Sequence, residues 1–117
     1  MQFLVLLTAR DHFARWEALS PDQVDEAMDS FRSFAKAVQE RGEIVAGDAL
    51  FAPDAARTVQ PGPDRVVSDG PFAETVEQLA GFYVIDVDDL ETAVDLARIL
   101  PGTTAVEVRP TQGVQIR

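Results

Sequence analysis

Residues 66–90, VVSDGPFAETVEQLAGFYVIDVDDL, decide the fold of this chain. A turn sequence, Asp69-Gly70-Pro71-Phe72, precedes an apolar run from Leu79 to Val87, and a helix start follows the run. Both parities of the run are apolar, with Phe82 and Val84 on one and Leu79, Tyr83, Ile85 and Val87 on the other. This pattern is typical of a strand that is covered on both faces of its sheet.

The start of the chain repeats this pattern. Gln2–Ala9 is apolar on both parities and predicts a second strand buried on two faces. Arg10–Leu19 is more polar and predicts a connection without regular structure. Two further strands are expected at Glu43–Leu50, where Gly47 indicates a bulge or a close backbone approach, and at Ala105–Pro110.

The first expected helix spans Pro21–Arg41. Ser20 is a good N-cap, and Gln23 stands three residues later, as in a capping box. Gly42 fits the left-handed position that often ends a helix. The helix is amphipathic, because apolar residues recur at helical spacing in the set Val24, Ala27, Met28, Phe31, Phe34, Ala35 and Val38.

The second expected helix follows the apolar run. Asp88 is expected as its N-cap, with Glu91 completing a capping box. Pro101-Gly102 is expected to end it. Between the second strand and the apolar run, the turn sequence Pro61-Gly62-Pro63-Asp64 predicts an inserted β-hairpin with arms at Arg57–Gln60 and Arg65–Ser68.

The predicted order is that of a split βαβ arrangement, an α+β class, ferredoxin-like βαββαβ fold with an inserted hairpin. Two helices can cover only one face of the four main strands. The strands Gln2–Ala9 and Leu79–Val87 carry apolar residues on the other face as well. A second copy of the sheet would cover that face economically, so we expect a homodimer closed sheet to sheet.

Composition narrows the function. The length of 117 residues predicts a single domain over 1–117. The net charge of −10 argues against nucleic acid and against anionic membranes as partners. The chain has no cysteine, and neither a signal peptide nor a membrane span is evident, so we expect a cytoplasmic protein. Without a phosphate loop, nucleotide fingerprint or zinc signature, we expect no cofactor and no metal.

The stretch SDGPFAETVEQLAGFYVIDVDDLETAVDLA resembles the DGPF signature of YCII-related proteins. The approach to the hairpin at Leu50–Ala52 and the segment VEVRP are also similar to that family, so the resemblance covers nearly the whole chain. It implies a dimeric α/β barrel. Members are largely without an assigned reaction, and some are encoded or fused with extracytoplasmic-function sigma factors, which implies a functional link to them. Distant relatives include a dehalogenase with a proposed His–Asp pair.

The chain departs from the family pattern in its first helix. Family members often carry a histidine where this chain has Phe31, between Met28 and Phe34. Phenylalanine cannot transfer a proton. The only histidine is His12, which the sequence places in a solvated loop at a position that does not match the family histidine. We therefore expect no histidine-dependent catalysis, and we expect Phe31 to fill apolar space.

The DGPF turn supplies the main candidate site. Asp69 is the family residue that matches, as a general base or ligand acceptor. The alternative is structural, because Asp before Gly often bonds its own backbone two residues on. Gly70 is expected at positive φ, Pro71 to fix the turn and Phe72 to pack. Arg109 is a further candidate for an anionic ligand, and Phe31 completes the candidate ligand-binding set.

Two functions follow from these observations. The first is a small dimeric module that binds a small molecule or a partner protein. The second is an enzyme of isomerase, lyase or dehalogenase type that acts on a small organic acid, with Asp69 in the dimer cleft. The missing helix histidine favours the binding module. The environment of Asp69 tests a site role, because a closed, dry cavity around it would support binding or catalysis, whereas a solvent-filled turn would support neither.

Overall fold

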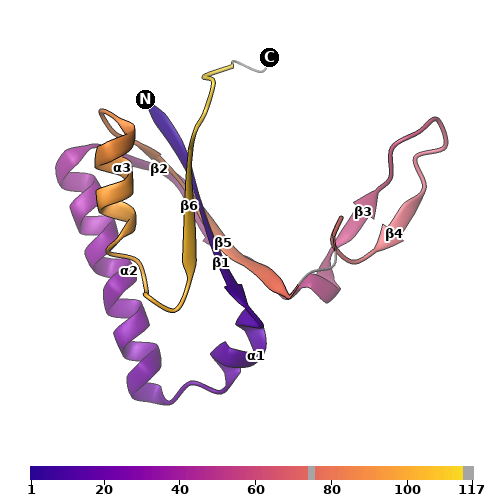
Figure 1. Cartoon of the computed structure of the whole chain (residues 1–117), viewed down its shortest axis with the longest axis horizontal. Helices are drawn as coiled ribbons and strands as arrows, with labels where there is room; N and C mark the ends of the chain where they lie inside the picture. The colour runs from indigo at the N-terminus through magenta and orange to yellow at the C-terminus, as the bar shows by residue number, and fades with distance from the viewer. Residues whose placement is uncertain (74–75, 115–117) are drawn as a thin grey trace.

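The computed structural model describes residues 1–73 and 76–114, and in this part of the chain an antiparallel sheet carries helices on one face (Figure 1). The sheet order is β2-β5-β1-β6. Its strands are β1 (Gln2–Arg10), β2 (Glu43–Ala49), β5 (Glu77–Asp86) and β6 (Ala105–Pro110). The mixed α+β class is as expected, and the strand order is compatible with a ferredoxin-like fold.

The helices are α1 (His12–Glu17), α2 (Pro21–Arg41) and α3 (Leu90–Ala97). The segment Arg10–Leu19 was expected to lack regular structure, and α1 shows that this expectation was wrong. The core lies between the sheet and α2 and α3. Phe3, Val5, Phe34, Val38 and Ile85 are fully buried there.

The start of α2 agrees with its sequence signals, whereas its end does not. Ser20 Oγ accepts a hydrogen bond from the Gln23 N–H at 3.2 Å, and Gln23 Oε1 accepts one from the Ser20 N–H at 2.9 Å. This confirms the capping box. Gly42, however, has a φ of 174°, which is extended rather than left-handed. Glycine is needed there for another reason, because a Cβ would run into the carbonyl oxygen of Asp86.

The N-cap of α3 is one residue later than expected. Asp89, not Asp88, accepts a hydrogen bond from the Thr92 N–H at 2.8 Å. The helix consequently begins at Leu90, and Glu91 lies in its first turn rather than at the third capping position. This bond lowers the pKa of Asp89, since it favours the ionised carboxylate.

The edge strand β2 approaches β5 closely. A Cβ on Gly47 would meet the Tyr83 ring, which confirms the expected close approach. The pairing of β2 with β5 is irregular between Ile44 and Ala46. A second irregularity, in the pairing of β1 with β5, places Leu79 opposite Thr8. Leu79 therefore lies on the face away from the helices and is 41% exposed, although its parity predicted the face of Tyr83.

The face of the sheet opposite α2 and α3 is not covered by a helix in the described residues (Figure 1). It is apolar on the two inner strands β1 and β5, whereas Glu107, Arg109 and Asp48 flank it on the edge strands. Leu4 pairs with Val84 and Leu6 pairs with Phe82, and all these side chains are half-buried. We call Leu4, Leu6, Phe82 and Val84 the open sheet face. Sequence parity predicted apolar residues on this face, and the structure places them there.

A separate two-stranded antiparallel sheet stands between β2 and β5 in the chain. It consists of β3 (Arg57–Val59) and β4 (Val67–Asp69), which follow the short 3-10 helix η1 (Pro53–Ala55). Both strands are shorter than the arms expected from the sequence. Figure 1 shows the pair to the right of the main sheet, away from α2 and α3.

Candidate functional site

Asp69 ends β4 on the exposed edge of the two-stranded sheet. Its side chain is 94% exposed, and its Oδ1 lies 3.7 Å from Nε of Arg57, its cross-strand neighbour. Asp69 lines neither the cleft beside α1 nor the cleft between α3 and β6. The expected bond to its own backbone two residues on cannot form, because that residue is Pro71 and proline has no N–H. Asp69 is thus a surface carboxylate in the single chain.

The residues after Asp69 shape the turn. Gly70 has a φ of 90°, which confirms the expected left-handed conformation. Its N–H donates to the carbonyl of Ala56 at 2.7 Å, and its own carbonyl accepts from Thr58 Oγ1 at 2.8 Å. Phe72 was expected to pack, but it is 89% exposed. The short strands beside it offer no layer of side chains against which it can pack.

Arg109 lies on β6, at the edge of the sheet opposite to β2. Its guanidinium pairs with Glu107 Oε2 at 2.9 Å and is 71% exposed. It stands opposite Leu4 and so borders the open sheet face. Because the two-stranded sheet follows β2 at the other edge, the single chain does not bring Arg109 and Asp69 into one site.

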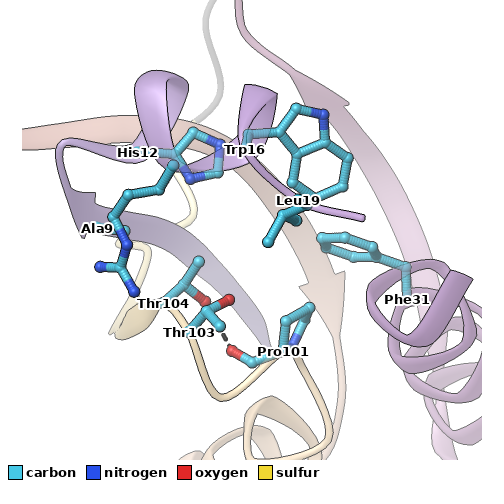
Figure 2. A pocket seen from close by; sticks show the side chains of 9 residues that line it. Ala9, His12, Trp16, Leu19, Phe31, Pro101, Thr103 and Thr104 are labelled. Atoms are coloured by element: carbon cyan, nitrogen blue, oxygen red, sulfur yellow. Dashed lines mark hydrogen bonds between the residues drawn. The ribbon is translucent and has the colours of Figure 1, made fainter. Parts of the chain in front are cut away.

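Phe31 is half-buried on α2, where it packs against the core and also lines a cleft. The same cleft contains His12 (Figure 2). His12 was expected in a solvated loop, but it is the first residue of α1 and is half-buried. The structure therefore brings together the only histidine of the sequence and Phe31, the residue for which the resemblance implied a histidine in family members.

The backbone before His12 is held in an uncommon conformation. Asp11 has a φ of 50°, which costs about 1 kcal/mol in a non-glycine residue. Its N–H donates to the carbonyl of Val76 at 2.9 Å, and the Phe13 N–H donates to Gln78 Oε1 at 3.2 Å. These bonds fix the start of α1 against β5 and thereby direct the His12 side chain.

We call this hollow the α1 cleft. Its free volume is about 50 Å³. It is bounded by the end of β1, by α1, by α2 and by the segment before β6, through Ala9, His12, Arg15, Trp16, Leu19, Phe31, Pro101, Thr103 and Thr104. The His12 ring stacks near Trp16, with ring centroids 6.2 Å apart. Figure 2 shows His12 and Trp16 above the cleft and Phe31 at its side.

The ionisable groups of the cleft are both basic. Burial lowers the pKa of His12 below its ordinary value of 6.5, and the nearby Arg15 guanidinium lowers it further. Arg15 Nη1 donates a long hydrogen bond of 3.4 Å to the carbonyl of Arg10. Sequence reasoning missed Arg15 and Trp16. The spacing of His12, Arg15 and Trp16 at i, i+3 and i+4 is the signal that would have placed them on one helical face.

Residues 1–73 and 76–114 contain no group of three or more His, Asp or Glu side chains arranged to hold a metal ion. Within the same residues, every helix is too short or too polar to cross a bilayer.

Comparison with known proteins places the chain in a family. An uncharacterized protein of Rhizobium meliloti (strain 1021) is 38% identical over 98 residues, which cover 80% of this chain and 79% of that protein. The family model described as the YCII-related domain matches residues 1–112. The DGPF turn, the apolar strand β5 and the strand β6 all lie within that match. The chain belongs to the YCII-related family.

Proposed function

We propose that the protein is a small homodimeric module that binds a small-molecule ligand. In this dimer the open sheet faces of two copies pack together, as in a dimeric α/β barrel. The hairpin of β3 and β4, inserted between β2 and β5, reaches toward the second copy. The observation that carries the proposal is the excess surface of the single chain.

The size of this excess follows from two measures. The accessible surface is 8402 Å², whereas a folded monomer of this mass exposes about 6,300 Å². The radius of gyration is 16.0 Å, against about 13.4 Å for a compact domain of this length. The difference in surface is about 2,100 Å² per chain, or about 4,200 Å² for two chains, and obligate homodimers bury about 2,000–5,000 Å² in total.

Apolar residues on the excess surface also fit a protein interface. Leu4, Leu6, Phe82 and Val84 form an apolar patch without a covering layer in the described residues. Phe51 and Phe72 are 90% and 89% exposed near the hairpin. Contiguous apolar surface of this kind marks interaction sites in soluble proteins. Both features support a partner on the side of the sheet that α2 and α3 leave free.

The geometry of the single chain supports the enzymatic alternative less well than it supports the dimer. It requires Asp69 to lie in an enclosed cleft, but in the single chain this carboxylate is exposed beside Arg57. In the single chain the exposed turn supports neither catalysis nor binding at Asp69, so the proposal depends on the open sheet face rather than on the DGPF turn.

Light scattering on the wild type tests the dimer. We expect twice the chain mass of 12.8 kDa at micromolar protein concentration. Phe82→Glu should give a folded monomer, because a carboxylate in the middle of an apolar interface is costly. Leu90→Glu is the matched control, since Leu90 is 46% exposed on α3 and away from the open sheet face. A monomeric wild type would refute the proposal, as would a Phe82→Glu variant that stays dimeric.

A further inference from the structure

The α1 cleft departs from the charge pattern of the rest of the molecule. The chain carries 20 acidic and 10 basic residues, yet the ionisable residues that line the cleft are His12 and Arg15. No carboxylate is among the described residues at the cleft. Near neutral pH Arg15 supplies the positive charge of the cleft, because the lowered pKa of His12 leaves its imidazole neutral and able to donate one N–H. A guanidinium with no carboxylate beside it in the cleft favours an anion there.

Arg15 is available to such an anion. Four other arginines take part in ion pairs within the described residues, namely Arg32, Arg57, Arg98 and Arg109. Arg15 has only the long bond to the Arg10 carbonyl among the contacts of that part of the chain. Its remaining N–H groups suit a carboxylate, which accepts two parallel hydrogen bonds from a guanidinium.

The rest of the cleft is apolar and small. Trp16, Leu19 and Phe31 contribute large apolar side chains (Figure 2). The free volume of about 50 Å³ equals roughly four water positions at 10–15 Å³ each. This space suits a short alkyl chain. A phosphate ion lacks the apolar part that these walls would cover.

We infer that the α1 cleft binds a short-chain monocarboxylate. Its carboxylate lies at Arg15 and His12, and its alkyl chain packs against Trp16, Leu19 and Phe31. The inference rests on the proposed function only in that the protein binds a small molecule. The cleft is formed by residues of one chain on the helical side of the sheet, so it does not require the open sheet face.

The chain contains its own reporters for this test. Trp16 is the only tryptophan and His12 the only histidine, so tryptophan fluorescence and the histidine proton resonances both report on the cleft. Butyrate is the probe, and butyramide is the neutral control of the same shape, with ionic strength held constant. We expect saturable butyrate binding with a Kd of about 1 mM, as befits a ligand of this size.

Two variants test whether butyrate binding depends on the charge of Arg15 or on a general change in the fold. Arg15→Gln should weaken butyrate binding at least about tenfold, since it removes the charge-assisted hydrogen bonds. Arg32→Gln is the matched control, because Arg32 is exposed on α2 and paired with Asp29, and it should bind butyrate like the wild type. Light scattering on each variant should show the same mass as the wild type.

The inference is overturned if butyrate changes neither the Trp16 emission nor the His12 resonances up to about 50 mM, fifty times the expected Kd. Equal binding of butyramide overturns it as well, and so does an Arg15→Gln variant that binds butyrate normally. These outcomes leave the dimer untouched. Conversely, a monomeric wild type that binds butyrate through Arg15 refutes the proposed dimer and supports the cleft.

Discussion

Replacement of Phe31 by alanine, compared with the same change at Phe34, tests whether the α1 cleft is open in solution. The two side chains lie one helical turn apart on α2. Phe34 is 0% exposed, and its ring centroid is 4.8 Å from that of Tyr83. Phe31 is half-buried, with one side of its ring on the core and the other on the cleft.

The expected costs differ accordingly. A fully buried phenylalanine loses about 3–5 kcal/mol of stability on truncation to alanine, and this range applies to Phe34. The sequence alone would assign the same range to Phe31 as a core position. Because the cleft leaves part of the Phe31 ring without neighbours, we expect about half of it, roughly 1.5–2.5 kcal/mol.

Thermal unfolding followed by circular dichroism measures the difference. For a chain of this length 1 kcal/mol corresponds to about 4 °C, so we expect a Tm loss of about 6–10 °C for Phe31→Ala and 12–20 °C for Phe34→Ala. All samples need one protein concentration, because dimerisation makes the Tm concentration-dependent. Val114→Ala, at a residue 72% exposed, serves as the control.

Two results would refute the reasoning. Equal losses for the two variants would mean that the Phe31 ring is enclosed on all sides and that the cleft is closed in solution. A loss under about 1 kcal/mol for Phe31→Ala would mean that the ring does not pack against the core. Either result would also remove an apolar wall from the site inferred for the carboxylate.

Two further predictions concern ionisable residues. Asp69→Asn should leave the Tm within about 2 °C of the wild type, because the ion pair with Arg57 is exposed; a much larger loss in thermal unfolding would contradict the surface role. His12 has a lowered pKa in the folded state because of burial and Arg15, so the unfolded chain binds the proton more readily. Its contribution to stability therefore grows as the pH rises from below the folded pKa to above 6.5. Thermal unfolding at several pH values should show a weaker loss on acidification in His12→Gln than in the wild type, and equal losses would contradict this.

The main elements of the fold were predictable because their signals are local. The Ser20 capping box fixes the start of α2, and the alternating or continuous apolar runs fix β1, β5 and β6. The boundaries of α2 and β6 agree with those expected from the sequence. Such signals depend on residues a few positions apart, which a single sequence shows directly.

The errors arose where distant residues decide the conformation. Gly42 is required by the carbonyl of Asp86, which lies on β5 rather than in the helix. Leu79 changes face because the pairing with β1 is irregular at Leu7 and Thr8. Neither contact is visible in the local sequence, since it depends on the register between strands.

The candidate site was predicted less well than the fold. The family signature drew attention to Asp69, which the single chain leaves on the surface. The α1 cleft went unnoticed because α1 is only 6 residues long and has no N-cap hydrogen bond. A helix this short has little intrinsic stability and depends on tertiary contacts. The bonds from Asp11 to Val76 and from Phe13 to Gln78 supply them.

The order of strands in the sheet has a consequence for synthesis of the chain. Among the strands of this sheet β1 is synthesised first, although it is an inner strand, and its partners β5 and β6 are synthesised after α2, β2, β3 and β4. The backbone groups of β1 therefore have no strand partner until β5 has been synthesised, and its apolar side chains Phe3, Val5 and Leu7 stay without their neighbours on β5 and β6 until then.

Contacts between such distant residues form slowly, and an unpaired apolar strand is prone to aggregate in the meantime. Incomplete chains that end before β5 contain α2, but they lack the strands that pair with β1. We expect nascent chains of this protein to engage chaperones until residue 86 has emerged, and to become protease-resistant only after β6 has joined the sheet.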